Sequence, residues 1–360
     1  MRSLLSLSSI ALLASVACWG CSSSTPSGGF GTPGFTVDGG AGSGGDSSTV
    51  LPGSGDASQV LTHGDAATAG DTGVATTVTL IYADTDTALY TLDPQTNTVA
   101  LVGNFTGFSG ASGDDGATDC AVDAEGDVYI NSETVIYKAT LPAGGTGTVA
   151  LSKIASIAVG NDQSFYALAF APAGVLGSGE TLVGGDNNGE LWTIDTSSGA
   201  IQDLGNFGAN PSKPKDILGL SGDIVFYMNS SGQPTGLATI RSCDSSGSDC
   251  TSTDDYLAGI DMTALQSAYT SRTPSSALLA GVYGGGSGSV GQGTGVGELF
   301  GLGAWEGSVY GFSHKTSELY TISPSSGVAS PLTSVASSGW AGAGVSTKVT
   351  ITVAPPPAAK

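Results

Sequence analysis

Short apolar runs alternate with turn-forming residues along most of the chain after about residue 75. The segment Glu190–Asp195, ELWTID, alternates polar and apolar positions, which is typical of a strand with one buried face. The nearly continuous apolar run Phe165–Gly174 precedes it and indicates a strand buried on both faces. With the strand ETLVGGD, the hairpin turn DNNG and the later run AIQDLGNF, the pattern predicts four antiparallel strands, the innermost first.

The same pattern of strands and turns returns several times. LYTLDPQTNTVALVGNF, beginning at Leu89, resembles LWTIDTSSGAIQDLGNF at Leu191 and LYTISPSSGVASPL at Leu319. Two further segments, from Ala117 and from Asp216, fit the same order of strands, and the second is longer. Units of about 40–50 residues that each supply four strands are typical of β-propellers, whose sheets surround a central axis.

The two ends of the repeat region each hold part of a unit. The segment from Thr77 has three strands and no inner one, whereas the segment from Gly339 has an inner-strand pattern with no unit after it. Pairing them would complete one blade and leave no exposed sheet edge. We therefore predict an all-β, five-bladed β-propeller at residues 76–354, closed by pairing of its N- and C-terminal strands. A sandwich of two unequal sheets is the alternative that strand spacing leaves open.

Two repeat units carry a family resemblance. CAVDAEGDVYI, beginning at Cys120, and ELYTISPSSG, beginning at Glu318, resemble the repeats of secreted bacterial β-propellers of the NHL and YWTD-like kind. The resemblance covers roughly residues 77–353 and implies the architecture. It implies no particular subfamily, because these motifs consist of strands and turns and contain no catalytic signature.

The N-terminal residues predict export. One arginine precedes an apolar run that is too short to span a bilayer, which is typical of a signal peptide at residues 1–17. The sequence SVAC at Ser15–Cys18 resembles the lipobox of bacterial lipoproteins, and the resemblance implies that Cys18 is lipidated. Cys21 is the alternative lipidation site, and a signal peptide with incidental cysteines is a third interpretation.

Composition separates the flanking segments from the repeats. Residues 18–75 are rich in Gly, Ser and Thr and cannot bury enough apolar surface to fold, so we predict a disordered tether. Residues 355–360 form a Pro/Ala-rich tail. These boundaries describe a folded domain held to a membrane through its N-terminal lipid.

The charge balance excludes one class of partner. The chain has 10 Lys and Arg against 31 Asp and Glu, a formal net charge of -21. Binding of nucleic acid or of an anionic lipid surface requires clustered basic residues, and the sequence has no basic stripe. We expect a monomer that contacts the membrane only through its anchor and binds no nucleic acid.

Three cysteines remain outside the signal region. Cys243 and Cys250 bracket the polar turn DSSGSD, and in an oxidising compartment we expect them to form a disulfide. Cys120 lies in a predicted inner strand, where we expect a small buried side chain.

Few residues offer catalytic chemistry. His314, in GFSHKTSELY, is the one histidine outside the tether, and no G-x-S-x-G motif accompanies it. We expect it to be a turn residue, and we predict no enzymatic activity. With one such histidine and a predicted disulfide, the sequence also indicates no zinc site.

Acidic and aromatic residues supply the candidate ligand sites. Asp114, Asp115 and Asp119, in GDDGATD, precede an inner strand on a loop between blades. Clustered carboxylates suit Ca²⁺, the one possible cofactor, although Asp in turns more often bonds to the local backbone. Trp305 and Trp340 lie near inner-strand starts and are candidates to face a ligand channel, with core packing as the alternative.

The sequence therefore predicts an exported, lipid-anchored propeller that binds an unidentified protein or glycan, or has a structural role, at the bacterial cell envelope. It would lie at the outer membrane or outside the cell. The alternative is a Ca²⁺-assisted propeller hydrolase or lyase acting on carbohydrate or lactone substrates.

Overall fold

The computed structural model describes residues 80–157, 164–247, 249–251, 254–284, 293–334, 339–348 and 350–351. The predicted signal peptide and tether, both candidate lipidation cysteines and the C-terminal tail lie outside these residues. All described residues belong to one compact unit, Gly55–Lys360, and they form strands apart from a single helix. None of the described helical residues makes a segment long and apolar enough to cross a bilayer.

The described strands form four sheets. The first has the order β21 (Trp340–Val345), β1 (Ile81–Thr85), β2 (Ala88–Asp93), β3 (Thr98–Thr106), β7 (Gly147–Ser156), β6 (Val135–Thr140), β5 (Val128–Asn131) and β4 (Asp119–Val122). The second contains β11 (Ile201–Asn206), β10 (Glu190–Ile194), β9 (Thr181–Asp186) and β8 (Phe165–Ala171). The third contains β12 (Ala209–Asn210), β13 (Lys213–Asn229), β14 (Pro234–Cys243), β15 (Tyr256–Ile260) and β16 (Leu279–Val282), with β22 (Thr350–Ile351) beside β13. The fourth contains β17 (Leu299–Trp305), β18 (Ser308–Ser313), β19 (Glu318–Ile322) and β20 (Ala329–Ser334).

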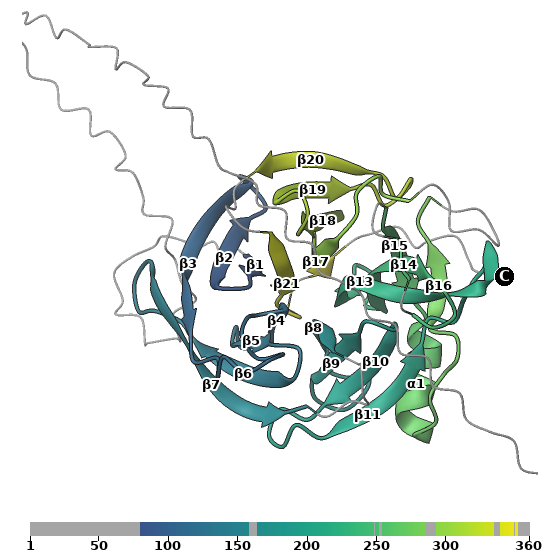
Figure 1. The fold of residues 1–360 in the computed structure, drawn as a ribbon, viewed down its shortest axis with the longest axis horizontal. Helices are drawn as coiled ribbons and strands as arrows, with labels where there is room; N and C mark the ends of the chain where they lie inside the picture. The colour runs from purple at the N-terminus through teal and green to yellow at the C-terminus, as the bar shows by residue number, and fades with distance from the viewer. Residues whose placement is uncertain are drawn as a thin grey trace, which may run out of the picture. The chain divides into compact units, whose positions relative to one another are not determined.

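The sheets are arranged around a common axis (Figure 1). Strands β21, β4, β8, β13 and β17 lie nearest the centre, and each contacts the next in that order, with β17 contacting β21. Later strands of each repeat lie progressively farther out, which is the arrangement of a β-propeller. The inner strands are buried on both faces, because each lies between neighbouring sheets as well as within its own.

Strands from the two ends of the described chain share one sheet. β1 pairs antiparallel with β21, and the register joins Ile81 to Val345 and Asp84 to Gly342. β1 also pairs with β2 on its other side, so its backbone is hydrogen-bonded along both edges. The two chain ends are thereby fixed to each other by main-chain hydrogen bonds.

One pairing differs from the expectation of separate four-stranded blades. The outermost strands β3 and β7 pair in parallel from Gly103–Gly147 to Thr106–Ala150, which merges two repeats into one eight-stranded sheet. A side chain at Gly103 would overlap the carbonyl oxygen of Gly147. The close approach therefore depends on glycine at this position.

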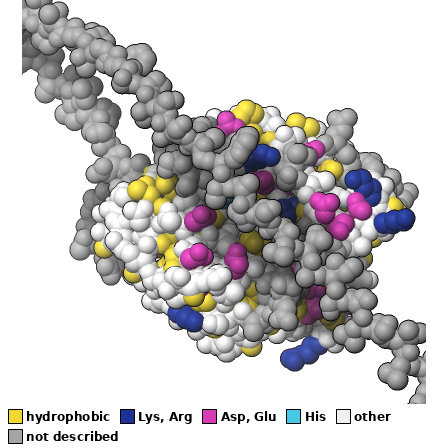
Figure 2. All heavy atoms as spheres, viewed as in Figure 1, with side chains coloured by type: hydrophobic (Ala, Val, Ile, Leu, Met, Phe, Trp, Pro, Cys, Tyr) yellow, Lys and Arg dark blue, Asp and Glu magenta, His cyan; other side chains and the backbone are white. Residues whose placement is uncertain are grey.

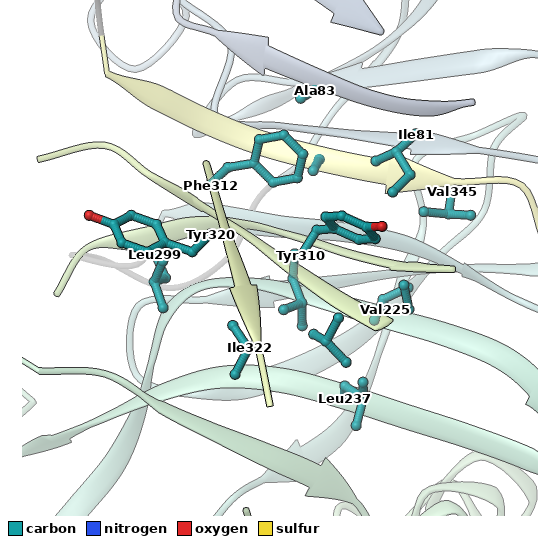
Figure 3. Close-up of a cluster of buried hydrophobic side chains, with 14 of the residues drawn as sticks. Ile81, Ala83, Val225, Leu237, Leu299, Tyr310, Phe312, Tyr320, Ile322 and Val345 are labelled. Atoms are coloured by element: carbon teal, nitrogen blue, oxygen red, sulfur yellow. The ribbon is translucent and has the colours of Figure 1, made fainter. Parts of the chain in front are cut away.

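Apolar side chains fill the spaces between the sheets. Figure 3 shows one such cluster, in which Ile81 and Val345 of the shared sheet lie near Tyr310 and Phe312 of β18. Val225 of β13 joins the same cluster, so it spans three sheets. Burial between sheets, rather than within one sheet, holds neighbouring units together.

The helix α1 (Met262–Ser271) is not predicted by the pattern of hydrophobic and polar residues. Asp261 caps its N-terminus by accepting hydrogen bonds from the backbone N–H groups of Thr263 and Ala264. Leu265 and Ala268 are its buried residues. The helix follows β15 in the longest repeat, where only strands were expected.

The cysteines in the described residues take the predicted states. Cys243 and Cys250 form a disulfide at the end of β14, which confirms that prediction. Cys120 is a free, fully buried thiol in the inner strand β4.

On the described part of the face in Figure 2, Lys and Arg side chains are scattered and make no continuous basic patch.

Candidate axial pocket

A pocket of about 300 Å³ lies where turns of several sheets meet beside the inner strands. It is formed by the β1–β2 turn, the loop before β4, the β5–β6 turn, the residue after β18, and the second residue of each of β8, β17 and β21. These elements come from repeats far apart in the chain, and packing between the sheets brings them together. The side chains that give the pocket its chemistry are those of Asp86, Asp115, Glu133, Tyr166, Phe300 and His314.

Glu133 is fixed in the pocket wall by two hydroxyl groups. The Ser164 hydroxyl donates to Glu133 Oε2 at 3.1 Å, and the Tyr166 hydroxyl donates to Oε1 at 3.4 Å. Burial, followed by the nearby Glu133 charge, raises the pKa of Tyr166, so this phenol remains a neutral donor. A carboxylate oriented in this way is a ready acceptor for a ligand N–H or O–H group.

His314 contributes a flat, polar surface to the same pocket. Its ring stacks on Phe300 with centroids 4.9 Å apart and an angle of 28° between the planes. His314 Nδ1 lies 3.1 Å from the Trp340 carbonyl oxygen. Because a carbonyl can only accept, Nδ1 carries the proton and Nε2 is left as an acceptor in the neutral ring. The residue is therefore held in place, and is not simply the solvated turn residue expected from sequence.

Buried carboxylates lie directly below the pocket. Thr118 lines the pocket, and the next residue, Asp119, is fully buried. Asp119 Oδ1 accepts from the N–H groups of Cys120 at 2.7 Å and Ala343 at 2.9 Å, while Oδ2 accepts from Leu168 at 2.6 Å. One side chain thus joins the inner strands β4, β21 and β8.

Asp223 has the same role in β13. Its Oδ1 accepts from the Ile224 N–H at 2.5 Å, and its Oδ2 accepts from the Leu302 N–H of β17 at 2.6 Å. Burial raises the pKa of both Asp119 and Asp223, and the Asp223 charge raises that of Asp119 further.

Asp84 completes this buried group from β1. Its carboxylate, an oxygen of Asp119 and the Cys120 sulfur lie within 4.8 Å of one another, and all three residues are fully buried. Neither Asp84 oxygen has a hydrogen-bond partner among the described residues. The Cys120 thiol lowers the pKa of Asp84, but burial dominates and raises it to about 8.

The three predicted Ca²⁺ ligands are not assembled into one site. Asp114 is buried in a local network, where Ser132 and Tyr137 hydroxyls each donate to Oδ1 at 2.7 Å. Asp115 is exposed and lines the axial pocket, whereas Asp119 lies in the buried group below it. Local hydrogen bonding, the alternative open at the sequence level, accounts for Asp114.

Neither candidate channel tryptophan is among the residues that line the axial pocket. Trp340 is fully buried and makes edge contacts with Tyr90 at 5.2 Å and Phe312 at 5.4 Å between ring centroids. Trp305 is partly buried and packs against the same core cluster. Both rings therefore contribute to packing between sheets, and Trp340 offers no surface to a ligand.

Sequence reasoning missed Asp86, Glu133, Tyr166 and Phe300 as pocket residues. Each lies in or beside an ordinary turn or strand end, and no motif distinguishes it from similar residues in other repeats. Their convergence depends on which repeats become neighbours at the axis. For Asp84 a signal existed, since an acidic side chain is uncommon at a buried strand position.

Comparisons with known proteins give a fold likeness and no family. No family model and no curated protein matches the chain. A chain of a nidogen/laminin complex is 11% identical, with 74% of this chain and 98% of that chain covered and a TM-score of 0.39. A Bacteroides thetaiotaomicron protein of unknown function is 13% identical, with 76% of this chain and 60% of that chain covered and a TM-score of 0.38. A virginiamycin B lyase from Staphylococcus aureus is 10% identical, with 72% of this chain and 71% of that chain covered and a TM-score of 0.31. These likenesses carry no argument on function, and the fold assignment rests on strand order and the ring of inner strands.

Proposed function

We propose that this protein is an exported, lipid-anchored, five-bladed β-propeller that binds a protein or glycan ligand in its axial pocket at the bacterial cell envelope. The β1–β21 pairing and the ring of inner strands support closure around five blades. The lipobox-like residues before Cys18, the tether composition and the Cys243–Cys250 disulfide support export.

The pocket itself is the observation that carries the binding role. Three carboxylates, from Asp86, Asp115 and Glu133, surround a cavity that also presents a stacked aromatic pair. Carboxylates accept hydrogen bonds from hydroxyl and ammonium groups, and an aromatic face packs against the apolar side of a sugar or a basic side chain. The pocket therefore suits a glycan or a basic peptide and disfavours anionic ligands.

Binding to an array of glycans and basic peptides tests this role. We expect micromolar binding of at least one class, and Glu133→Gln should weaken it about tenfold or more, because a charge-assisted hydrogen bond is lost. Glu125→Gln is the matched control, since Glu125 is exposed and lies outside the pocket lining. If the two variants bind the ligand equally well, the ligand does not bind in the axial pocket. If no glycan or basic peptide on the array binds, both proposed ligand classes are wrong.

Incorporation of labelled fatty acid tests the anchor separately. We expect Cys18→Ser to abolish labelling and to release the protein from the membrane fraction. Loss of labelling in Cys21→Ser instead would move the anchor to the alternative cysteine. If neither the parent protein nor either variant is labelled, the protein is not lipidated and the N-terminal segment is an ordinary signal peptide.

The alternative activity is a hydrolase or lyase acting on carbohydrate or lactone substrates. The observation that favours it is the presence of His314, with an acceptor nitrogen, in the same pocket as Glu133. Turnover of a glycan or lactone panel, with and without Ca²⁺, tests it. Activity lost in His314→Gln would support this alternative, whereas no turnover would leave the binding role alone.

A further inference from the structure

We propose that Asp84, Asp119 and Cys120 bind a Zn²⁺ ion in the buried centre of the propeller, beneath the axial pocket. The site is distinct from the pocket ligand site, so the two proposals can fail independently. It uses two carboxylates and one thiol that come from only two strands, β1 and the inner strand β4.

The unpartnered carboxylate of Asp84 is the primary evidence. The residue is fully buried, and both of its oxygens lack a hydrogen-bond partner among the described residues. A buried carboxyl group without partners costs several kcal/mol in general, so its presence in a packed core requires compensation. The Cys120 thiol lies beside Asp84, but it is a weak donor, and among the described residues no hydrogen bond joins the two side chains. A bound cation would satisfy both the carboxylate and the thiol.

The spacing of the ligand atoms fits a small cation. Zn–O bonds of about 2.0–2.2 Å and Zn–S bonds of about 2.3 Å place the ligands of a tetrahedral site roughly 3.3–3.8 Å apart. The three ligand atoms already lie within 4.8 Å of one another, so small side-chain movements would close the site. Asp119 is held in position by three backbone N–H groups, and such outer bonds orient metal ligands.

The donor set favours zinc over calcium. A thiolate is a soft ligand that selects Zn²⁺, whereas Ca²⁺ takes about six to eight oxygen ligands. Binding would release the protons of Asp84 and Cys120 to solvent, and the dipositive ion would offset the carboxylate and thiolate charges.

Residues close in sequence to two of the proposed ligands line the axial pocket. Thr118 immediately precedes Asp119 and lines the pocket, and Asp86, two residues after Asp84, lines it as well. The sequence indicates no zinc site, because it holds one histidine outside the tether and two of its remaining cysteines pair. The proposed ligands are mainly carboxylates. Because the sequence has 31 Asp and Glu residues, their number does not indicate a metal site.

Metal content and thermal stability of the purified full chain test the proposal. After removal of metal with a chelator, one equivalent of Zn²⁺ should rebind and raise the thermal midpoint by about 5 °C at a hundredfold excess over Kd. Asp84→Asn and Cys120→Ser should each lose the ion and the shift. Asp195→Asn, which alters an exposed turn carboxylate, should keep both.

Cobalt substitution gives a readout that does not depend on stability. Co²⁺ in the site should produce a thiolate-to-metal charge-transfer band in the near ultraviolet, and the band should be absent in Cys120→Ser. This measurement on the parent protein keeps the test decisive even where a variant fails to fold. Three results would overturn the proposal. The parent protein could bind no Zn²⁺ and show no charge-transfer band, the Cys120→Ser variant could retain the metal, or the protein could respond to Ca²⁺ alone.

Discussion

Asp119 and Asp223 occupy equivalent places in two inner strands, and each bonds to a leucine in the next strand of the ring. Asp119 accepts from the N–H of Leu168 at 2.6 Å, and Asp223 accepts from the N–H of Leu302 at 2.6 Å. Each also accepts from the N–H of the residue that follows it. Inner strands of different sheets are not paired as a ladder, so these carboxyl groups satisfy backbone donors that would otherwise be buried without partners.

Replacing Asp223 should therefore weaken the contact between β13 and β17. We expect Asp223→Asn to lower the free energy of unfolding by about 1–3 kcal/mol, because its amide nitrogen cannot accept one of the two backbone hydrogen bonds. Urea denaturation measures the change. Asp115→Asn, at an exposed carboxylate, should alter stability by less than about 0.5 kcal/mol. Equal effects of the two substitutions would contradict the structural role of Asp223.

Close packing at the axis predicts a strict requirement for glycine at Gly342. A methyl group there would overlap Oδ1 and Cα of Asp119, so β21 and β4 would have to separate. We expect Gly342→Ala to cost about 3 kcal/mol or more, measured by thermal or urea unfolding. Gly179→Ala is the control, since its added carbon would meet no atom within 4 Å. Comparable stability of both variants would show that the inner strands are farther apart than described.

The buried Asp186 predicts a decrease in stability with rising pH. Its Oδ1 accepts from the N–H groups of Asn188 at 2.9 Å and Glu190 at 3.0 Å in the β9–β10 turn. Burial raises the pKa of Asp186 from 3.8 to about 6. The unfolded chain therefore loses this proton at lower pH than the folded protein does. Stability from this group is complete below about pH 4 and is lost as the pH rises to about 6.

Asp186→Asn isolates this effect. The amide oxygen can accept the same two backbone hydrogen bonds, while the ionisation disappears. We expect the variant to equal the parent near pH 4 and to exceed it at pH 7 by about 1–3 kcal/mol. Urea denaturation at both pH values measures the difference. A variant that is less stable than the parent at pH 7 would show that the charge itself is needed.

Reduction of the disulfide should have a modest effect. Cys243 and Cys250 are only seven residues apart in sequence, so the loop that they close in the unfolded chain is short. Loop-closure entropy predicts a loss of about 2 kcal/mol, or about 4 °C in the thermal midpoint, on treatment with a reductant. The double variant Cys243→Ser/Cys250→Ser should melt near the reduced parent and show no response to the reductant. A response in the double variant would point to a general solvent effect.

The strands themselves were predictable from local sequence. The alternating segment ELWTID forms β10, and the apolar run from Phe165 forms β8. Cys243 and Cys250, on either side of a polar turn, form a disulfide. These features depend on side-chain alternation and turn residues within one repeat. Helix α1 was missed because its capping residue, Asp261, lies in a segment that otherwise resembles the strands around it.

The amino-acid sequence by itself determined the all-β class, the repeated order of strands and the burial of Cys120, because each follows from the polarity of neighbouring positions. Only the tertiary structure decided that Asp84, Asp119 and Asp223 meet in the buried centre, and that Glu133 and His314 share a pocket. Those residues belong to different repeats, and their distances are set by how the repeats pack around the axis. No local pattern of hydrophobic and polar residues encodes that packing geometry.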